Sequence, residues 1–305
     1  MLTMALATLM SIVMFDAKVS LSGDDCDYIL AADAFWHHFV FPGHHGSLYP
    51  IVLSPFVGLF GYRLVLLKFL SVLFTVGAFG FLYKAFERRI PSAVLIPSML
   101  LAAICSYIFF YAGYTYSEPL FMLLQSIYFY FFSRYFWVEG GTPSYTLRKD
   151  WKKYLTLGAL TLAMGLTREI GFCVIGVVIL YFAIKGRWKD LLYTVGAALL
   201  MLAAFYLVKA ILWPNVAAGH SFTNLMAKDY YNPNAGMEDT AGLLSRFWDN
   251  SRVYLSAFLC QMMGVMPETP SNRFDMSATR TLIIYGLYFA ALVVILVRRD
   301  APLLF

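Results

Sequence analysis

Most of the side chains that could do chemistry stand in one segment near the amino terminus. Three carboxylates, Asp24, Asp25 and Asp27, follow the first apolar run within one helical turn of sequence. Carboxylates grouped in this way can act as a general base toward a hydroxyl group or hold a divalent cation through oxygen ligands. The structural alternative is a helix start, with Ser22 as N-cap and acids that stabilise the helix dipole. Capping accounts for one or two acids, so we favour a functional role for the group.

Charged residues interrupt the apolar sequence at two other points. Glu118 directly precedes Pro119, where an apolar run begins, and a simple acid at a helix start is the alternative to a functional carboxylate. Arg168 and Glu169 split a later apolar stretch. Charges at membrane depth cost a few kcal/mol unless they are paired, so these two either serve a function or neutralise each other.

Four histidines come after the acids: His37, His38, His44 and His45. Their spacing matches no standard zinc pattern, which leaves two alternatives, a metal site of another kind or histidines at a membrane interface. The chain also lacks the glycine-rich motifs that bind nucleotides and the HExxH motif of zinc proteases. We therefore expect neither nucleotide hydrolysis nor zinc proteolysis.

The composition indicates a protein whose solvent is lipid. Of 305 residues, 60% are hydrophobic and 13% are charged, with a mean hydropathy of +0.68. A soluble domain carries roughly 25% charged residues. The net charge of +5 then reports membrane orientation rather than nucleic-acid binding, and we expect no nucleic-acid partner. Cys26 and Cys260 either form a disulfide on the outer side or remain free, because spacing alone does not decide.

The apolar runs predict an all-α polytopic membrane protein with about eight transmembrane helices. The runs are 1–15, 62–83, 90–111, 119–132, 154–166, 170–184, 191–213 and 282–297. Runs 154–166 and 170–184 are each shorter than the roughly 20 residues of a span, so we expect a helical hairpin with Arg168 at its tip. After the first run, Ile29, Ala32 and Trp36 recur at helical spacing, which predicts an interfacial helix.

These runs suggest three regions. Residues 1–213 form a transmembrane module with an outer loop at 16–61, and residues 214–280 form a polar extracytoplasmic loop region with turn signals. Residues 281–305 contain the last transmembrane helix and a cytoplasmic end.

Basic residues predict the orientation of the module. They gather at alternate ends of the runs: Lys84, Arg88, Arg89, Arg134, Arg148, Lys149, Lys152, Lys153, Lys185, Arg187, Lys189, Arg298 and Arg299. The positive-inside rule puts these ends in the cytoplasm. The acidic segment, Glu118 and Arg168 then share the outer side and can converge on one site. Lys68 and Lys209, within apolar runs, are expected to extend their ammonium groups to the interface.

The order of these features resembles a family, the GT-C glycosyltransferases that use sugars linked to polyprenyl phosphate. Its protein O-mannosyltransferases and aminoarabinose–lipid A transferases carry an Asp-Asp/Glu pair in the first outer loop, with a Tyr four residues after the first acid. Here GDDCDY matches that loop, HGSLYPIVLSPFVGLFGYRLVLLKFLS leads into the second span, and YSEPLFMLLQSIYFYFF opens the fourth. The LGALTLAMGLTREIGFCVIG hairpin resembles their glycine-rich helix pair. The match covers residues 1 to about 215.

The resemblance implies a role for each candidate residue. Asp24 would be the general base, with Asp25 and Glu118 orienting it, the acceptor or a bound cation. Arg168 would meet the leaving phosphate, and Arg63 is the second candidate. The remaining substrate-binding residues would be Tyr28, Tyr49 and Glu169. No cofactor is implied, although a divalent cation at Asp24, Asp25 and Asp27 stays open.

The resemblance also implies partners and a location. The donor would be a polyprenyl-phosphate sugar, the acceptor a lipid, glycan or protein, and the site would face outward from a bacterial cytoplasmic membrane. The alternative function is a transporter or flippase-like protein with an outer acidic gate. Against it, the acids lie in a loop and no internal repeat is visible.

Overall fold

The structure is a computed structural model that describes residues 2–18, 24–43, 46–136, 147–216, 226–229, 232–263, 266, 269 and 275–298. These residues are helical, and the single β-type contact among them is the isolated bridge between Ala227 and Met237. The all-helical expectation is confirmed for this part of the chain. Contacts divide the chain into two units, Met1–Val216 and Ala217–Asp300, which are described separately.

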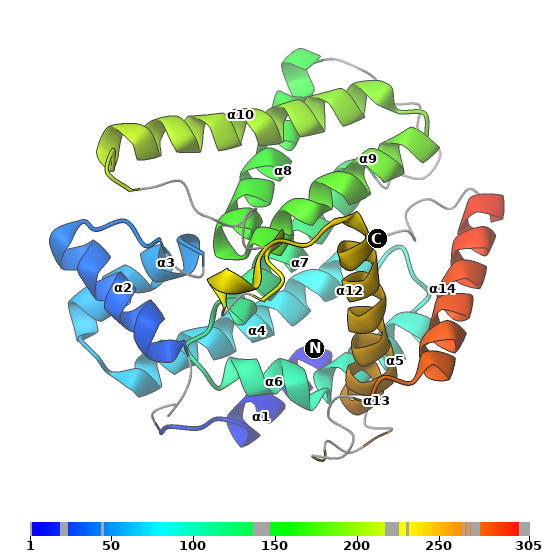
Figure 1. The fold of residues 1–305 in the computed structure, drawn as a ribbon, viewed down its shortest axis with the longest axis horizontal. Helices are drawn as coiled ribbons and strands as arrows, with labels where there is room; N and C mark the ends of the chain where they lie inside the picture. Colours follow the sequence, from blue (N-terminus) through cyan, green and yellow to red (C-terminus); the bar gives the residue numbers. More distant parts are fainter. Residues whose placement is uncertain are drawn as a thin grey trace. The chain divides into compact units, whose positions relative to one another are not determined.

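Helices follow one another closely through the first unit (Figure 1). They are α1 (Leu2–Val13), α2 (Asp25–His38), α3 (Leu48–Phe60), α4 (Leu64–Phe86), α5 (Ser92–Ala103), α6 (Ser106–Ala112), α7 (Ser117–Phe136), α8 (Leu147–Thr167), α9 (Val174–Ile184) and α10 (Trp188–Leu212). A short 3-10 segment, Glu169–Cys173, joins α8 to α9.

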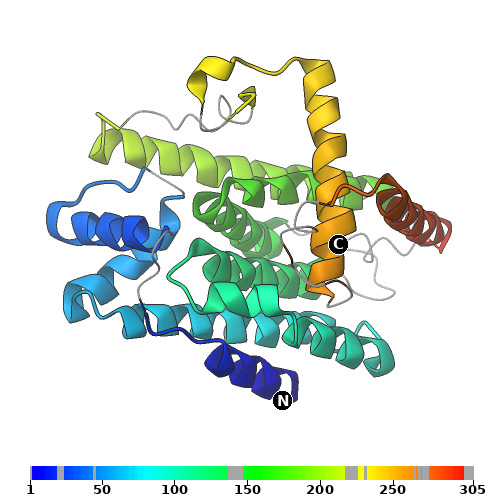
Figure 2. The same ribbon diagram turned by 60° about the horizontal axis from the view of Figure 1, so that its bottom comes forward.

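Helix α4 is central to the packing of the first unit. It lies along α7, and α1 packs on another side of it, as Figure 2 shows. α4 and α10 are the helices of the described chain that are long and apolar enough, by length and composition, to cross a membrane. Several other helices are apolar but shorter, among them α1, α3 and α5.

Buried apolar side chains form three clusters in this unit. One joins α2 and α3 to α4 and α7, and includes Tyr28, Leu53 and Leu67. A second joins α1, α4, α5 and α6 around Phe79 and Phe109. Close packing of these side chains brings many dispersion contacts, so the clusters hold the elements around the acidic segment.

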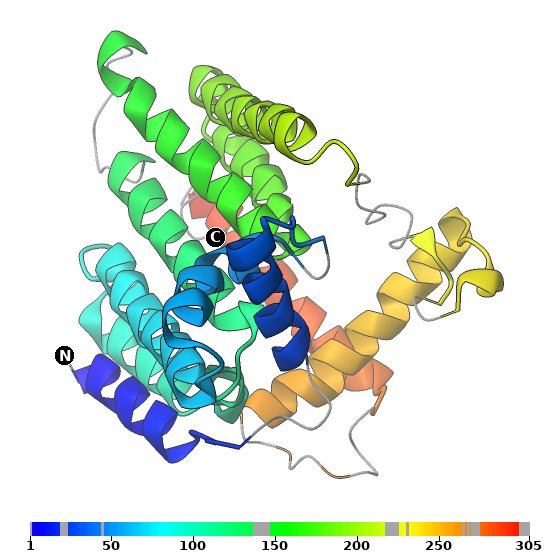
Figure 3. The ribbon, with the colours of Figure 1, turned by 90° about the vertical axis from the view of Figure 1, so that its left-hand side faces the viewer.

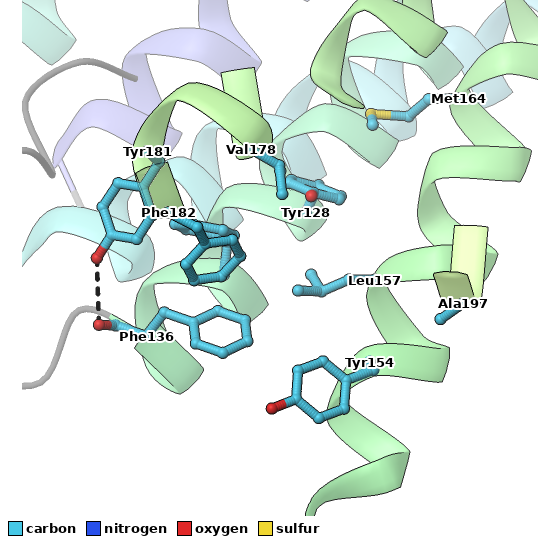
Figure 4. Close-up of a cluster of buried hydrophobic side chains, with 10 residues drawn as sticks. Tyr128, Phe136, Tyr154, Leu157, Met164, Val178, Tyr181, Phe182 and Ala197 are labelled. Carbon is cyan, nitrogen blue, oxygen red and sulfur yellow. Dashed lines mark hydrogen bonds between the residues drawn. The ribbon is translucent and has the colours of Figure 1, made fainter. Parts of the chain in front are cut away.

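The third cluster lies among α7, α8, α9 and α10, and Figure 4 shows its rings. In it the Tyr181 hydroxyl donates to the carbonyl oxygen of Phe136 at 3.3 Å. Helices α8 and α10 lie side by side, visible in Figure 3. The expected hairpin is present: α8 ends at Thr167, and α9 starts at Val174.

Several elements of the first unit differ from the expectation. α3 is a helix within residues 16–61, which we expected to be an outer loop. The run 90–111 is broken into α5 and α6 at Ile104 and Cys105, where the backbone leaves the helical conformation. The break lets α5 pack on α1 while α6 packs on α4 and α7. α7 begins at Ser117, so Pro119 lies inside the first turn instead of opening the helix, in a position where its missing N–H is tolerated.

The second unit contains helices that the sequence reading missed. α12 (Thr240–Val253) lies in the stretch that we expected to be a polar loop, and it continues through a π-helical turn (Tyr254–Phe258) into α13 (Leu259–Met262). The Asp239 side chain caps α12 by accepting from the backbone N–H of Gly242 at 2.7 Å. α14 (Ala278–Arg298) follows and matches the expected last helix.

Candidate functional site

Three segments that are distant in sequence meet at Ser117. The Tyr28 hydroxyl of α2 donates to Ser117 Oγ at 3.0 Å, and Arg168 Nη1 donates to the same oxygen at 3.3 Å. Arg168 Nη1 also lies 2.5 Å from Glu118 Oε1. This contact set, Tyr28–Ser117–Glu118–Arg168, is called the polar junction below. It brings together one residue of the acidic helix, the start of α7 and the tip of the hairpin.

Local structure explains why Arg168 reaches this point. α8 ends at Thr167, and Arg168 is in an extended conformation that directs the chain away from the helix axis. The 3-10 segment then packs back on α8, where Gly171 lies so close to the Met164 backbone that a Cβ would collide with it. Arg168 pairs with Glu118, and the expected alternative of pairing within the hairpin tip is not needed to balance its charge.

The acidic residues lie in different environments. Asp24 is the N-cap residue of α2 and is exposed, and its side chain makes no capping hydrogen bond. Asp27 is also exposed, whereas Asp25 is only 2% exposed. Asp24 thus begins the helix, and Asp25 and Asp27 lie in its first turn, as the alternative of a helix start stabilised by acids expects. Ser22, the expected N-cap, lies outside the described residues.

Asp25 ties α2 to the turn before α7. Its Oδ1 accepts a hydrogen bond from the backbone N–H of Thr115 at 2.6 Å, while Oδ2 is buried without a protein partner. Burial raises the pKa of Asp25 above its usual value of 3.8, and the Thr115 N–H and the charge of Lys68 oppose that rise. Asp25 therefore positions backbone, and the exposed acids of the group are Asp24 and Asp27.

Tyrosines form the inner wall of the polar junction. Burial raises the pKa of Tyr28 to about 12, so its hydroxyl is a neutral hydrogen-bond donor at physiological pH. The Tyr49 ring stands edge-on to it, with centroids 5.0 Å apart. We expected Tyr49 to bind substrate, but its side chain is completely buried. It packs against Tyr28 and offers no accessible group.

Arg63 and Glu169 are the remaining candidate residues. Arg63 is exposed in front of the first turn of α4 and lines a separate groove between α4 and α1. Glu169 is exposed at the start of the 3-10 segment. The candidate site is therefore the polar junction, in which Glu118 and Arg168 meet Tyr28 of α2, the helix that Asp24 begins.

Sequence reading missed two residues that organise the site. Ser117 accepts from both Tyr28 and Arg168, and its signal was its position directly before Glu118 at the start of an apolar run. Lys68 is wholly buried, and its ammonium donates to the carbonyl oxygens of Asp16 at 2.9 Å and Lys18 at 2.6 Å. The expectation that Lys68 reaches the membrane interface is wrong, because these carbonyls satisfy it inside the protein.

The histidine and cysteine residues were candidates for a metal site and a disulfide. His37 Nδ1 lies 3.1 Å from Asp33, while His44 and His45 lie outside the described residues. In the part of the chain that is described, no three His, Cys, Asp or Glu side chains gather as a metal-binding group. Cys26 and Cys260 are free cysteines and belong to different units.

No family model, curated protein or solved structure matches the chain.

Proposed function

We propose that the protein is a membrane glycosyltransferase that moves a sugar from a polyprenyl-phosphate donor to a hydroxyl group of a lipid, glycan or protein acceptor. The observation that carries the proposal is the polar junction, in which an acid-bearing helix, Glu118 and Arg168 meet. The ordered resemblance of residues 1 to about 215 to GT-C transferases supports the same reaction. A base and a phosphate-binding cation are the two groups that this reaction needs most.

Asp24 acts as the general base in this proposal. Its carboxylate takes the proton of the acceptor hydroxyl as the oxygen attacks the anomeric carbon of the sugar. The bond between that carbon and the phosphate oxygen breaks, the polyprenyl phosphate leaves with the bonding electrons, and the configuration inverts. Exposure of Asp24 supports this role, because its carboxylate can contact an acceptor, whereas Asp25 is buried against Thr115.

Arg168 receives the developing charge of the leaving phosphate. A guanidinium offers two parallel donors to phosphate oxygens and holds its charge at every physiological pH. Glu118 holds Arg168 in position before the donor arrives, and Ser117 fixes its second contact. A phosphate dianion then competes with the Glu118 carboxylate for the same guanidinium.

The reaction requires a protein embedded in the membrane with this site on the outer side. Helices α4 and α10, and the apolar but shorter helices of both units, support a multi-pass arrangement. The distribution of basic residues supports cytoplasmic ends opposite the junction. We propose a bacterial cytoplasmic membrane, with about eight helices crossing or re-entering the bilayer.

The test is transfer from a labelled polyprenyl-phosphate sugar in reconstituted membranes. Asp24→Asn should lower the transfer rate by about 10²–10⁴-fold, the usual contribution of a positioned base. Asp27→Asn is the matched control, since Asp27 is exposed on the same helix and should leave the rate within about twofold. An Asp24→Asn variant with the wild-type rate would exclude this base. Labelled lipid crossing the bilayer without sugar transfer, unaffected by Asp24→Asn, would instead support the transporter.

A further inference from the structure

A groove of about 510 Å³ lies between the end of α1 and the first turns of α4. Its apolar lining comes from both helices: Ile12, Phe15, Val65, Leu66, Phe69 and Val72. Ser11 also borders it, but the Ser11 hydroxyl donates to the carbonyl oxygen of Ala7 at 2.8 Å and is satisfied inside α1. The walls therefore offer a ligand apolar contact, and the volume falls in the range of about 300–1,000 Å³ typical of small-molecule sites.

One cation borders this apolar space. Arg63 lines the groove in front of the first turn of α4, and its side chain is exposed. Within the described residues the Arg63 side chain forms no ion pair or hydrogen bond, in contrast to Arg168, whose charge is balanced by Glu118. The helix start adds partial positive charge at the same point. A ligand that complements both features has a hydrocarbon chain and an anionic head group.

The groove faces a different side of α4 from the candidate site. Val65, Phe69 and Val72 recur at helical spacing on the groove side. Lys68, Ser71 and Thr75 form the neighbouring stripe, which is buried, and the charge of Lys68 acts on Asp25. A lipid in the groove therefore presents its head group to Arg63 and not to the acidic residues. This separation favours a lipid of the surrounding bilayer over the sugar donor.

We propose that the α1–α4 groove binds an anionic phospholipid of the bilayer, with an acyl chain along Phe69 and Val72 and the phosphate on Arg63. The bound chain covers apolar side chains that the fold leaves open, such as Val65 at 53% exposure and Phe69 at 49%. The site requires the membrane location but is independent of the transferase chemistry.

Native mass spectrometry of the purified full chain, after exchange into phosphatidylglycerol or phosphatidylcholine, tests the site. Two variants remove its two features: Arg63→Gln removes the charge, and Val65→Trp fills the groove from an exposed position. Each should lower the retention of phosphatidylglycerol about tenfold, as expected for losing one charge-assisted contact or the chain site. Retention of phosphatidylcholine should be lower than that of phosphatidylglycerol in the wild type.

Matched controls come from the same helix. Lys84→Gln removes an exposed charge at the other end of α4, and Leu73→Trp adds a ring at a position that is 51% exposed and outside the groove. Both should retain phosphatidylglycerol like the wild type. Equal loss in the controls, or equal retention of the two lipids by the wild type, would overturn the proposal.

A competition arm distinguishes the bilayer lipid from the donor. Polyprenyl phosphate should displace phosphatidylglycerol no better than an equal amount of another anionic phospholipid. Preferential displacement would assign the groove to the donor and refute the phospholipid assignment. Absence of sugar transfer by the wild type would refute the transferase reaction and leave this lipid measurement unchanged, so the two failures are separable.

Discussion

Asp24 and Asp25 are neighbours in the chain, yet their carboxylates meet opposite surroundings. The Asp24 carboxylate is exposed at the start of α2, and the Asp25 carboxylate is buried against the Thr115 N–H and near Lys68. A base needs access to its substrate, whereas a positioning group needs fixed partners. Asp24 therefore suits the role of a base, and Asp25 suits the role of a positioning group.

Burial of Asp25 makes a pH-dependent contribution to stability. Because its pKa is raised in the folded state above the usual 3.8, the folded protein holds this proton more tightly than the unfolded chain does. The contribution of Asp25 to the free energy of unfolding therefore falls as the pH rises from about 4 through the raised pKa. Asp25→Asn keeps an oxygen acceptor for the Thr115 N–H and cannot ionise, so it should remove this part of the pH dependence.

Thermal unfolding of the purified protein between about pH 4 and pH 7 measures this effect. Asp25→Ala should lower stability at every pH by about 1–3 kcal/mol, because it leaves a buried N–H without its acceptor. Asp27→Asn, on the exposed side of the helix, should preserve the wild-type profile. An Asp25→Asn protein with the wild-type slope would show that Asp25 is not the titrating group.

At the scale of elements, the loop before α3 supports the hairpin tip. Gly46 has a φ of +91°, which favours glycine, and a Cβ there would collide with the carbonyl oxygen of Thr167. Thr167 directly precedes Arg168, so this contact holds the residue that pairs with Glu118. The loop before α3 and the hairpin tip are therefore positioned together.

Gly46→Ala should push the loop before α3 away from Thr167 at the end of α8. The strained φ and the collision should cost about 1–3 kcal/mol of stability and lower sugar transfer through displacement of Arg168. Gly43→Ala is the matched control in the same loop, because its added Cβ meets nothing within 4 Å and its φ is not positive. Thermal unfolding and transfer assays on both variants make the comparison. Equal effects of the two substitutions would rule out the Thr167 contact as the cause.

At the scale of the whole molecule, the proposed orientation predicts which side of the membrane each residue faces. Cys26 is exposed in the acidic helix, and Lys84 is exposed near the end of α4, where basic residues gather. In a protein with Cys26 as its single cysteine, a membrane-impermeant maleimide should label intact cells. In a cysteine-free protein carrying Lys84→Cys, labelling should require permeabilised cells.

The converse labelling pattern would invert the orientation and remove the basis for an outward-facing site. Labelling of both positions in intact cells would mean that α4 does not separate them across a bilayer. A denatured sample labelled in parallel shows that both thiols are reactive when accessible.

The helical fold class and the positions of the polar interruptions could be predicted from the sequence alone. Apolar periodicity is local, so the hairpin around Arg168 and the helix that follows the acids could be predicted from neighbouring residues alone. One error arose where packing competes with local pattern, at the break near Ile104. The helix after Asp239 was missed although its N-cap is a local signal.

The contacts between polar groups of distant segments could be identified only from the tertiary structure. The burial of Asp25, the pairing of Arg168 with Glu118 and the capture of Lys68 by two backbone carbonyls depend on segments far apart in the sequence. Side-chain exposure is set by the helix faces that cover a residue, and no local pattern contains that information. For the same reason the sequence predicted Asp24 as a candidate acid, but it did not predict that Asp24 is exposed while Asp25 is buried.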